Sequence, residues 1–244
     1  VPYYIVGNGS NLLVSDQGYE GVIIQIYKQM NQVEITENEI HAQAGALLSM
    51  IANRAMEAEL TGFEFAAGIP GTLGGACVMN AGAYGGEMKD VLETVNVLTR
   101  DGDVKTLTKD ELELGYRTSV IAKKDYIVLS AVIRLENGKK EEIKAVMDDL
   151  KEKRITKQPL EYPSAGSTFK RPEGYFAGKL IQDAGLRGFQ VGGAQVSEKH
   201  CGFVVNKDQA TAADVMNLMN QVSDKVYEMS GVRLEPEVKR LGVF

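Results

Sequence analysis

Three glycine-rich segments could bind a phosphate group through their backbone. Glycine has no Cβ, so its N–H group can approach a pyrophosphate without steric interference. Any two of these segments, if they lay close together, would suit a long, flat ligand that carries a pyrophosphate. The segments are Gly7-Asn8-Gly9-Ser10-Asn11-Leu12, Gly68-Ile69-Pro70-Gly71-Thr72-Leu73-Gly74-Gly75-Ala76 and Asn80-Ala81-Gly82-Ala83-Tyr84-Gly85-Gly86.

Each segment also has a simpler explanation. The first lacks the third glycine of the dinucleotide-binding fingerprint and continues into residues 12–14, which predict a strand rather than a helix. It is therefore not a Rossmann loop, and an ordinary tight turn explains it about as well as a ligand site does. The other two could be flexible surface loops, although such loops usually carry more charge. Because each glycine costs a helix roughly 1 kcal/mol relative to alanine, we expect residues 68–76 to form a loop.

Composition excludes several classes of protein. The chain of 244 residues has a formal net charge of −6, and its scattered Lys and Arg residues argue against nucleic acid as a partner. The two cysteines and two histidines are not spaced as metal ligands, so we expect a reduced protein without a metal site. The longest uncharged stretch, 65–86, is too rich in glycine to span a membrane. No signal peptide is visible, so we expect a cytoplasmic protein.

Short β-rich runs alternate with helical patterns in the first part of the chain. The pair Asp101-Gly102 tolerates the positive φ of a tight turn and predicts a hairpin between the strands at 91–98 and 104–107. The other patterns predict strands at 3–6, 22–26 and 125–135, a strand pair within 33–44, and helices at 47–60 and 139–153. Because the chain starts directly in a strand pattern, we expect it to begin inside a domain.

The prolines within residues 158–163 interrupt all periodicity and predict a domain boundary. Beyond this boundary the sequence predicts short strands near Ala194 and at 203–206, and helices at 175–184 and 212–229. Thr211 or Ala210 opens the last helix and Gly231 closes it. Residues 232–244 are expected to be extended.

Five segments follow one another along the chain in a specific order. They are Gly7-Asn8-Gly9-Ser10-Asn11-Leu12-Leu13, Gly68-Ile69-Pro70-Gly71-Thr72-Leu73-Gly74-Gly75, Gly115-Tyr116-Arg117-Thr118-Ser119, Ala165-Gly166-Ser167-Thr168-Phe169-Lys170 and Leu234-Glu235-Pro236-Glu237-Val238. Together they resemble the motifs of the UDP-N-acetylenolpyruvoylglucosamine reductase family, and the likeness extends over the whole chain. Five motifs in order are far more specific than any one of them.

The resemblance implies an α+β protein with an FAD-binding fold of the vanillyl-alcohol-oxidase type. The FAD-binding domain would comprise residues 1–157, a smaller α/β substrate-binding domain residues 158–230, and a tail at 231–244 would return to the active site. One branch of the family has a tyrosine-bearing insertion, for which the chain has no room between Phe169 and Phe203, so we expect the shorter form. Family members carry an N-terminal segment that supplies the first FAD subdomain, and we expect it to be missing here.

The resemblance also implies a two-stage reaction, in which hydride passes from NADPH to FAD and then to the methylene carbon of an enolpyruvyl ether. Negative charge then develops on the carbon that bears the carboxylate, so the site needs a cation, an acid and a proton donor. By their positions in the motifs, Arg117 would bind the carboxylate and Ser167 would protonate the carbon. Glu237 would donate a hydrogen bond or a proton to the enolate, a role that suits a buried carboxyl group.

These three residues have ordinary alternatives when each is considered alone. An arginine at a strand or loop edge is usually a surface residue, and a serine such as Ser167 is most often in a turn or a helix cap. Glu235 lies two positions from Glu237, on the same face of an extended chain, so either carboxylate could face inward. The position within the family motif favours Glu237.

The resemblance assigns further residues to the cofactor and to the substrate. The expected FAD contacts are Gly7, Asn8, Gly9, Ser10, Asn11, Leu12, Gly68, Ile69, Pro70, Gly71, Thr72, Gly74, Gly75, Asn80, Ala81 and Gly82. The expected contacts to a UDP-sugar are Tyr116, Lys170, Arg171, Lys179 and Gln195. Arg171 stands where some family members carry an amide residue.

Two other functions are compatible with the glycine-rich segments. Another flavin oxidase of the same fold, acting on a sugar or a hydroxy acid, would share these loops but would not need the segments around Ser167 and Glu237. A non-catalytic module that binds nucleotide sugars would show neither flavin absorbance nor NADPH turnover. For the reductase we expect a nucleotide-sugar substrate, no membrane partner, and a monomer or weak dimer.

Overall fold

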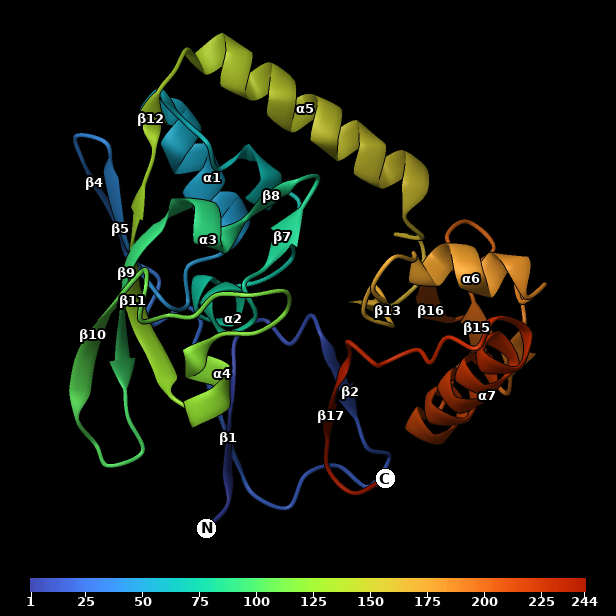
Figure 1. Ribbon diagram of the computed structural model, residues 1–244. Coiled ribbons are helices and arrows are strands. Elements are labelled where there is room, and N and C mark those ends of the chain that lie inside the picture. Colours follow the sequence, from blue (N-terminus) through green and yellow to red (C-terminus); the bar gives the residue numbers. More distant parts are fainter. The chain divides into compact units, whose positions relative to one another are not determined.

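The computed structural model describes residues 1–244, which form two compact units (Figure 1). Unit 1 comprises residues 1–9 and 22–154, and unit 2 comprises residues 10–21 and 155–244. Each unit has its own cluster of buried apolar side chains. None of the helices is both long and apolar enough to cross a membrane.

Unit 1 is built on a five-stranded antiparallel sheet with strand order β10-β9-β11-β5-β4. Its strands are β4 (Val33–Thr36), β5 (Glu39–Gln43), β9 (Leu92–Leu98), β10 (Val104–Thr108) and β11 (Ile127–Arg134). The predicted hairpin is confirmed, because β9 and β10 are adjacent and antiparallel, and Gly102 between them has a φ of 90°. The predicted strand pair within 33–44 is also confirmed.

Three pairs of short strands complete the β structure of unit 1. They are the parallel pair β1 (Tyr3–Val6) and β3 (Val22–Gln25), the antiparallel pair β6 (Leu60–Thr61) and β12 (Glu136–Asn137), and the hairpin of β7 (Gly82–Ala83) and β8 (Gly86–Glu87). The hairpin follows α2 directly and therefore belongs to the third glycine-rich segment.

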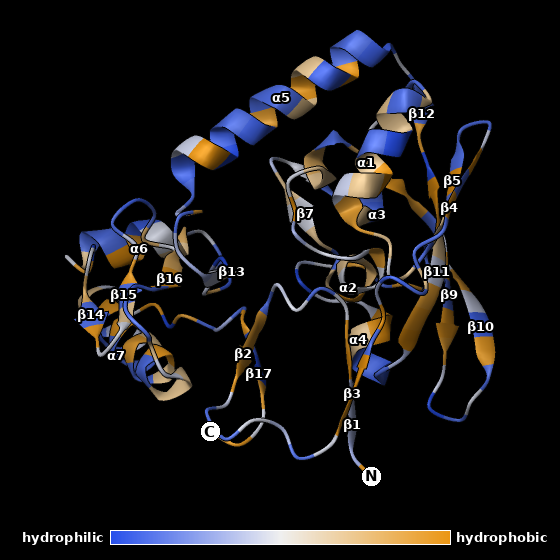
Figure 2. Ribbon diagram, turned by 180° about the vertical axis from the view of Figure 1, so that it is seen from behind, coloured by the Kyte–Doolittle hydropathy of each residue, from blue (hydrophilic) through white to orange (hydrophobic).

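The helices of unit 1 are short except for the last. They are α1 (Leu48–Glu57), η1 (Glu64–Ala66), α2 (Leu73–Met79), α3 (Met88–Val91), α4 (Val120–Lys124) and α5 (Lys140–Lys157). Figure 1 shows α1 and α2 on one side of the sheet. Helix α5 is largely hydrophilic along its length, as Figure 2 shows, and only Ile143 of its side chains is buried.

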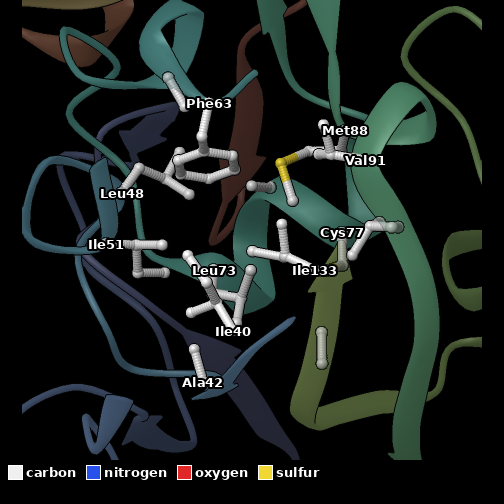
Figure 3. Close-up of a cluster of buried hydrophobic side chains, with 14 of the residues drawn as sticks. Ile40, Ala42, Leu48, Ile51, Phe63, Leu73, Cys77, Met88, Val91 and Ile133 are labelled. Carbon is white, nitrogen blue, oxygen red and sulfur yellow. The ribbon is translucent and has the colours of Figure 1, made fainter. Parts of the chain in front are cut away.

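The core of unit 1 lies between the sheet and helices α1 and α2. Figure 3 shows Ile40 and Ile133 from the sheet packed against Leu48 and Leu73 from the two helices. Phe63 is fully buried in the same cluster and makes an edge-on contact with Phe65, with ring centroids 5.5 Å apart. This continuous apolar contact fixes the start of α2 relative to the sheet.

Unit 2 contains a four-stranded antiparallel sheet, two helices and a parallel strand pair. The sheet order is β13-β16-β15-β14, and the elements are β13 (Ser164–Ser167), β14 (Gln190–Val191), β15 (Ala194–Val196), β16 (Phe203–Asn206), α6 (Ala177–Asp183) and α7 (Ala212–Ser230). Of the two residues predicted to open α7, Thr211 and Ala210, Thr211 is the cap; Gly231 ends the helix as predicted, with a left-handed φ of 70°.

The first glycine-rich segment divides between the two units. Its second half leads into β2 (Leu12–Val14), which pairs in parallel with β17 (Lys239–Leu241) in unit 2. The Asp16 carboxylate accepts hydrogen bonds of 2.7 and 3.0 Å from the N–H groups of Ala212 and Ala213 at the start of α7. Unit 2 therefore contains residues 10–21, although they belong to the stretch 1–157 that we expect to form the FAD-binding domain. The domain boundaries at 157 and 230 stay predictions.

Four helices of unit 1 were not predicted, namely η1, α2, α3 and α4. The prediction of a loop at 68–76 is wrong from Leu73 onward, because α2 begins there and includes Gly74 and Gly75. Helix α4 is only five residues long and too short to produce a periodic pattern.

Both cysteines are free and buried, and burial raises the pKa of the Cys77 thiol to about 12.

Candidate functional site

The first two glycine-rich segments lie against each other within unit 1. A Cβ on Gly7 would stand 2.2 Å from Thr72 Oγ1, so only glycine allows this approach. The Asn8 side chain donates a hydrogen bond of 2.7 Å to the carbonyl oxygen of Pro70, and Gln25 Nε2 donates one of 3.1 Å to the carbonyl of Gly7. The two segments, 62 residues apart in sequence, are therefore in direct contact.

Helix α2 turns the second segment back toward the sheet. The N–H groups of Leu73 and Gly74 donate hydrogen bonds of 2.8 Å to the carbonyls of Ala46 and Ala44, which follow β5. A Cβ on Gly74 would lie 3.1 Å from Ala44 Cβ and 3.2 Å from Ala44 O. Close packing onto β5 thus explains this glycine, and it explains why a helix forms despite its glycine content.

Gly71 and Gly75 have a different environment from Gly7 and Gly74. The nearest atoms that a Cβ on Gly71 or Gly75 would meet lie 3.9 and 3.8 Å away, which is ordinary van der Waals contact, and neither residue has a positive φ. The protein itself therefore does not require glycine at these two positions. The predicted ligand-binding role of these two glycines stays a prediction.

Asn80 fixes the third glycine-rich segment. It ends α2 in a left-handed conformation with φ 47°, and its side chain is almost fully buried. Its Nδ2 donates to Glu87 at 2.5 Å and to the carbonyl of Gly115 at 3.1 Å, while its Oδ1 accepts from the N–H of Lys89 at 2.8 Å. Asn80 therefore joins the β7–β8 hairpin to the segment that carries Arg117.

Arg117 lies in a tight turn between Gly115 and Thr118, with a positive φ of 55°. Its guanidinium lies over the ring of Tyr116, 5.1 Å from the ring centroid. Ser119 follows the turn, caps α4, and donates a hydrogen bond of 2.7 Å to the carbonyl of Val78 in α2. Buried polar contacts to α2 thus hold this turn close to the glycine-rich segments of unit 1.

Ser167 is the last residue of β13 in unit 2, where it is exposed and paired with Phe203 of β16. The neighbouring Thr168 is buried and fixes the strand, because its N–H donates to the carbonyl of Gly202 at 2.9 Å and its hydroxyl accepts from the N–H of Val204 at 2.8 Å. Ser167 is therefore a strand residue rather than a turn or helix-cap residue.

The segment with Glu237 runs beside the segment with Ser167. The N–H of Glu237 donates to the carbonyl of Thr168 at 2.9 Å, and the N–H of Lys170 donates to the carbonyl of Glu235 at 2.8 Å. Glu237 is 8% exposed, whereas the Glu235 side chain is 73% exposed and forms a 3.1 Å ion pair with Lys170. The two carboxylates thus lie in different environments, although they are two positions apart on an extended chain.

Residues 10–12 of the first glycine-rich segment also meet this part of unit 2. Asn11 Nδ2 donates to the carbonyl of Glu237 at 3.3 Å, and the N–H of Lys239 donates to the carbonyl of Asn11 at 2.9 Å. The structure therefore brings Ser167, Glu237 and half of the first segment together in unit 2. Arg117 and the remaining glycine-rich segments lie in unit 1.

Comparison with known proteins identifies the family. Residues 158–241 match the C-terminal domain of UDP-N-acetylenolpyruvoylglucosamine reductase, and residues 1–108 match an FAD binding domain. The UDP-N-acetylenolpyruvoylglucosamine reductase of Agathobacter rectalis is 59% identical over 256 residues, which cover 100% of this chain and 82% of the relative. The chain belongs to the UDP-N-acetylenolpyruvoylglucosamine reductase family.

Other reductases support the same assignment. The reductase of Clostridioides difficile is 55% identical over 99% of this chain and 80% of its own length. The crystal structure of the Thermus caldophilus reductase superposes with a TM-score of 0.85 and 38% identity, covering 98% of this chain and 85% of that one. The predicted family and its FAD-binding fold are therefore confirmed.

Of the five residues predicted to contact the nucleotide sugar, Tyr116 lies in unit 1 and the other four have varied surroundings in unit 2. Lys179 forms an exposed pair with Asp183 on the same helix. The Arg171 guanidinium lies 4.0 Å from the centroid of the Phe176 ring, and its Nε donates to the carbonyl of Tyr175 at 3.3 Å. Gln195 is buried and lines a polar pocket of ≈ 340 Å³, together with Ser197, Lys199 and Lys207. The substrate contacts stay predictions.

Arg154 adjoins the second glycine-rich segment and was not predicted from the sequence. Its Nη1 donates a hydrogen bond to the carbonyl of Gly68. Residues 151–154 form a short charged run on a surface helix, and nothing in this pattern separates the last cation from its neighbours. Only the packing of α5 against residue 68 distinguishes it.

Proposed function

We propose that this protein reduces UDP-N-acetylglucosamine enolpyruvate to UDP-N-acetylmuramate with NADPH through bound FAD, as a step in the synthesis of peptidoglycan precursors. The observation that carries the proposal is that, in a member of this reductase family, the segments of Ser167 and Glu237 are hydrogen-bonded side by side. The first glycine-rich segment also reaches Glu237 through Asn11.

The glycine-rich backbone would hold the cofactor. Gly71 and Gly75, where a Cβ would meet only ordinary contacts, would present their N–H groups to a pyrophosphate, while Gly7 and Gly74 keep the surrounding segments packed. Residues 8–12 and 80–82 would supply the other contacts. When bound, FAD accepts hydride from NADPH and makes it available to the substrate.

Three side chains would manage the charge that develops on the substrate. Addition of hydride to the methylene carbon leaves an electron pair on the adjoining carbon, delocalised into the carboxylate. The Arg117 guanidinium is suited to bind that carboxylate by a charge-assisted hydrogen bond. The hydroxyl of Ser167 would give its proton to the carbon, and Glu237 would donate a hydrogen bond or a proton to the enolate oxygen.

The burial of Glu237 supports its role over that of Glu235. Glu237 is 8% exposed and lies among groups of the protein, whereas the Glu235 side chain is 73% exposed and forms an ion pair with Lys170. Ser167 is exposed on a strand that backbone hydrogen bonds hold firmly, so its hydroxyl can meet a ligand without rearrangement of the backbone.

The remaining proposals concern the substrate contacts and the state of the protein. Tyr116, Lys170, Arg171, Lys179 and Gln195 would contact the nucleotide sugar, and the protein would act in the cytoplasm as a monomer or weak dimer. Alanine variants of these five residues should raise the KM for the nucleotide sugar more than they change kcat. Sedimentation at several concentrations would test the oligomeric state.

The first experiment is a visible spectrum of the purified protein, followed by NADPH oxidation with and without UDP-N-acetylglucosamine enolpyruvate. A flavin spectrum with oxidation that depends on this substrate supports the reductase. Oxygen consumption with a reduced sugar or hydroxy acid would instead indicate an oxidase. Binding of a UDP-sugar with neither flavin nor NADPH turnover would indicate a binding module and overturn the proposal.

A further inference from the structure

Strand β13 contains a β-bulge just before Ser167. Ser164 lies opposite Val205 of β16, and Ser167 lies opposite Phe203. The two residues of β13 are three positions apart, whereas their partners are two positions apart, so β13 holds one extra residue. Gly166, within the bulge, has a φ of 80°, and a Cβ at this position would meet no atom within 4 Å. The backbone conformation alone therefore favours glycine here.

The extra residue decides which face of the sheet carries Ser167. Residues paired across two strands have their side chains on the same face, and a shift of one residue moves a side chain to the other face. Val204, which lies between the two partners, belongs to the buried cluster that includes Leu180 of α6 and Leu218 of α7. Without the bulge, Ser167 would share the face of Val204 and point toward these helices. With the bulge, it lies on the opposite face.

The opposite face also carries a residue predicted to contact the substrate. Gln195 of β15 pairs with Val205, so its side chain shares the face of Ser167. Gln195 and Val205 both line the polar pocket described above. The bulge thus places the exposed Ser167 hydroxyl on the face of the polar pocket instead of in the apolar core.

Thr168 holds the strand on the other side of Ser167. Its hydroxyl accepts a hydrogen bond of 2.8 Å from the N–H of Val204, the residue opposite the bulge, and its N–H donates to the carbonyl of Gly202 at 2.9 Å. Its carbonyl accepts from the N–H of Glu237 at 2.9 Å. Because Thr168 is only 2% exposed, these bonds are shielded from water. Thr168 therefore ties the bulge both to β16 and to the segment of Glu237.

We infer that Gly166 and Thr168 are positioning residues for the proposed reaction. The left-handed glycine forms the bulge that turns Ser167 to the face of the polar pocket, and the threonine hydroxyl holds the bulge against β16. This inference rests on the proposed function, because it names the residues that direct its proton donor. A displacement of about 1 Å in a reacting group can slow a reaction about 100-fold, so a small change in this strand should reach the chemistry.

The competing explanation is that the bulge only protects an edge of the sheet. β13 is the edge strand in the order β13-β16-β15-β14, and bulges at edges discourage pairing with another chain. On this explanation, loss of the bulge would change stability or aggregation and leave the reaction of the folded protein unchanged.

Three substitutions separate these two explanations. Gly166→Ala strains the left-handed backbone without adding a steric clash, and Gly166→Asn supplies a side chain that tolerates this conformation better. Gly185→Ala is the matched control. Gly185 follows α6 in the same unit, has a φ of 70°, and a Cβ there would also meet no atom within 4 Å. It therefore introduces the same kind of strain outside β13.

The two half-reactions are measured by stopped-flow absorbance of the flavin. We expect Gly166→Ala to slow reduction of the UDP-sugar by about 10- to 100-fold, to lower kcat more than it changes the KM for the sugar, and to leave flavin reduction by NADPH unchanged. Gly166→Asn should restore most of the rate. Gly185→Ala should lower the urea midpoint about as much as Gly166→Ala does, but leave both half-reactions unchanged.

The hydroxyl of Thr168 is tested in the same assay. Thr168→Val removes the acceptor for the Val204 N–H, whereas Thr168→Ser keeps it. We expect the valine variant to slow reduction of the UDP-sugar and the serine variant to resemble the unchanged protein. Equal rates in the two variants would show that the hydroxyl has no part in positioning Ser167.

A combined variant decides whether Gly166 acts through Ser167. In a protein that already carries Ser167→Ala, Gly166→Ala should cause no further slowing, because the group that it positions is gone. Slowing that multiplies in the combined variant, a normal rate in Gly166→Ala alone, or an equal loss in Gly185→Ala would overturn the inference. Failure of the proposed function would appear separately: Ser167→Ala alone would then leave substrate reduction unchanged, and the inference would fail with it.

Discussion

The candidate site residues of unit 1 and those of unit 2 differ in how far steric contact restricts them. In unit 1, the glycine-rich segments make hydrogen bonds, such as that from the Gly74 N–H to the Ala44 carbonyl, and in addition close steric contacts, as between Gly7 and Thr72. In unit 2, the segments of Ser167 and Glu237 are fixed by backbone hydrogen bonds through Thr168. Steric contacts restrict which residues the chain can carry, whereas backbone hydrogen bonds are made by nearly every residue type.

This difference predicts which substitutions change the stability of the protein and which change only the reaction. A change of residue in the close-packed segments of unit 1 should disturb the fold and the cofactor together. A change of the exposed Ser167 side chain should disturb the reaction and leave the backbone hydrogen bonds intact. The predictions below test this contrast.

The largest effect is expected for Ser167→Ala. Removal of the proposed proton donor should slow reduction of the UDP-sugar by about 100- to 10,000-fold, because protonation of the carbon is the step assigned to this hydroxyl. Reduction of the flavin by NADPH, followed by stopped-flow absorbance, should be unchanged, as should the urea midpoint of unfolding. Equal slowing of both half-reactions would contradict the assigned role.

The next largest effect is expected for Glu237→Gln, compared with Glu235→Gln as its control. The first change should lower the rate of substrate reduction by about 100-fold, since a glutamine cannot give up a proton to the enolate. The second should have little effect, because Glu235 is exposed and paired with Lys170. Steady-state rates of NADPH oxidation at saturating substrate give the comparison. Similar losses in both variants would show that burial does not decide between the two carboxylates.

A smaller effect, on stability, is expected for Gly7→Ala. The added Cβ would stand 2.2 Å from Thr72 Oγ1, and overpacking of this kind typically costs about 1–3 kcal/mol. Urea unfolding should show the loss, together with reduced flavin content. Gly71→Ala is the control within the adjoining segment, because its Cβ would meet only ordinary contacts. It should leave the stability unchanged but weaken flavin binding; an equal loss of stability in both variants would contradict the steric argument.

The smallest effect concerns the pH dependence of stability through His200 in unit 2. Its ring lies against Phe203, with centroids 5.1 Å apart, and its Nδ1 accepts from the N–H of Gly202 at 3.0 Å. Burial lowers the pKa of His200, and the charge of Arg187 lowers it further, against an opposing backbone hydrogen bond. The unfolded chain therefore binds this proton more readily than the folded one does. Stability should fall as the pH drops below about 6.5, the ordinary pKa of histidine.

His200→Gln should reduce that fall. Urea midpoints between pH 8 and pH 5 would measure it, with His41→Gln as the control, because His41 has an exposed side chain on a sheet strand of unit 1. A fall of the same size in His200→Gln and in the unchanged protein would show that other groups account for it.

Sequence patterns predicted the long elements better than the close contacts. Helices α1 and α7 and the β9–β10 hairpin were predictable because their apolar periodicity or turn residues are local signals. Helix α2 was not, because the reason for Gly74 is its distance from Ala44, which no local pattern contains. The prediction of a ligand-binding role for the glycine-rich segments rested on their residue types and on the family resemblance.

The site residues show the same limit. Ser167, Glu237 and Arg117 were selected by their motifs, and their roles stay predictions. The different environments of Glu235 and Glu237 depend on how the segment lies against Phe169 and Thr168, contacts some 65 residues away in the chain. Arg154 was not predicted because an arginine at the end of a charged helix has no distinguishing sequence signal.

The parallel pairing of β2 with β17 has a consequence for how the protein is made. The chain leaves unit 1 after Gly9, returns at Val22 and leaves again after Arg154, so neither unit is a continuous stretch of polypeptide. During synthesis, residues 10–21 must wait for residues 239–241 before their strand has a partner. Unit 2 is therefore expected to complete its fold only after residues 239–241 have been synthesised, and the unpaired segment is a place where a chaperone could act.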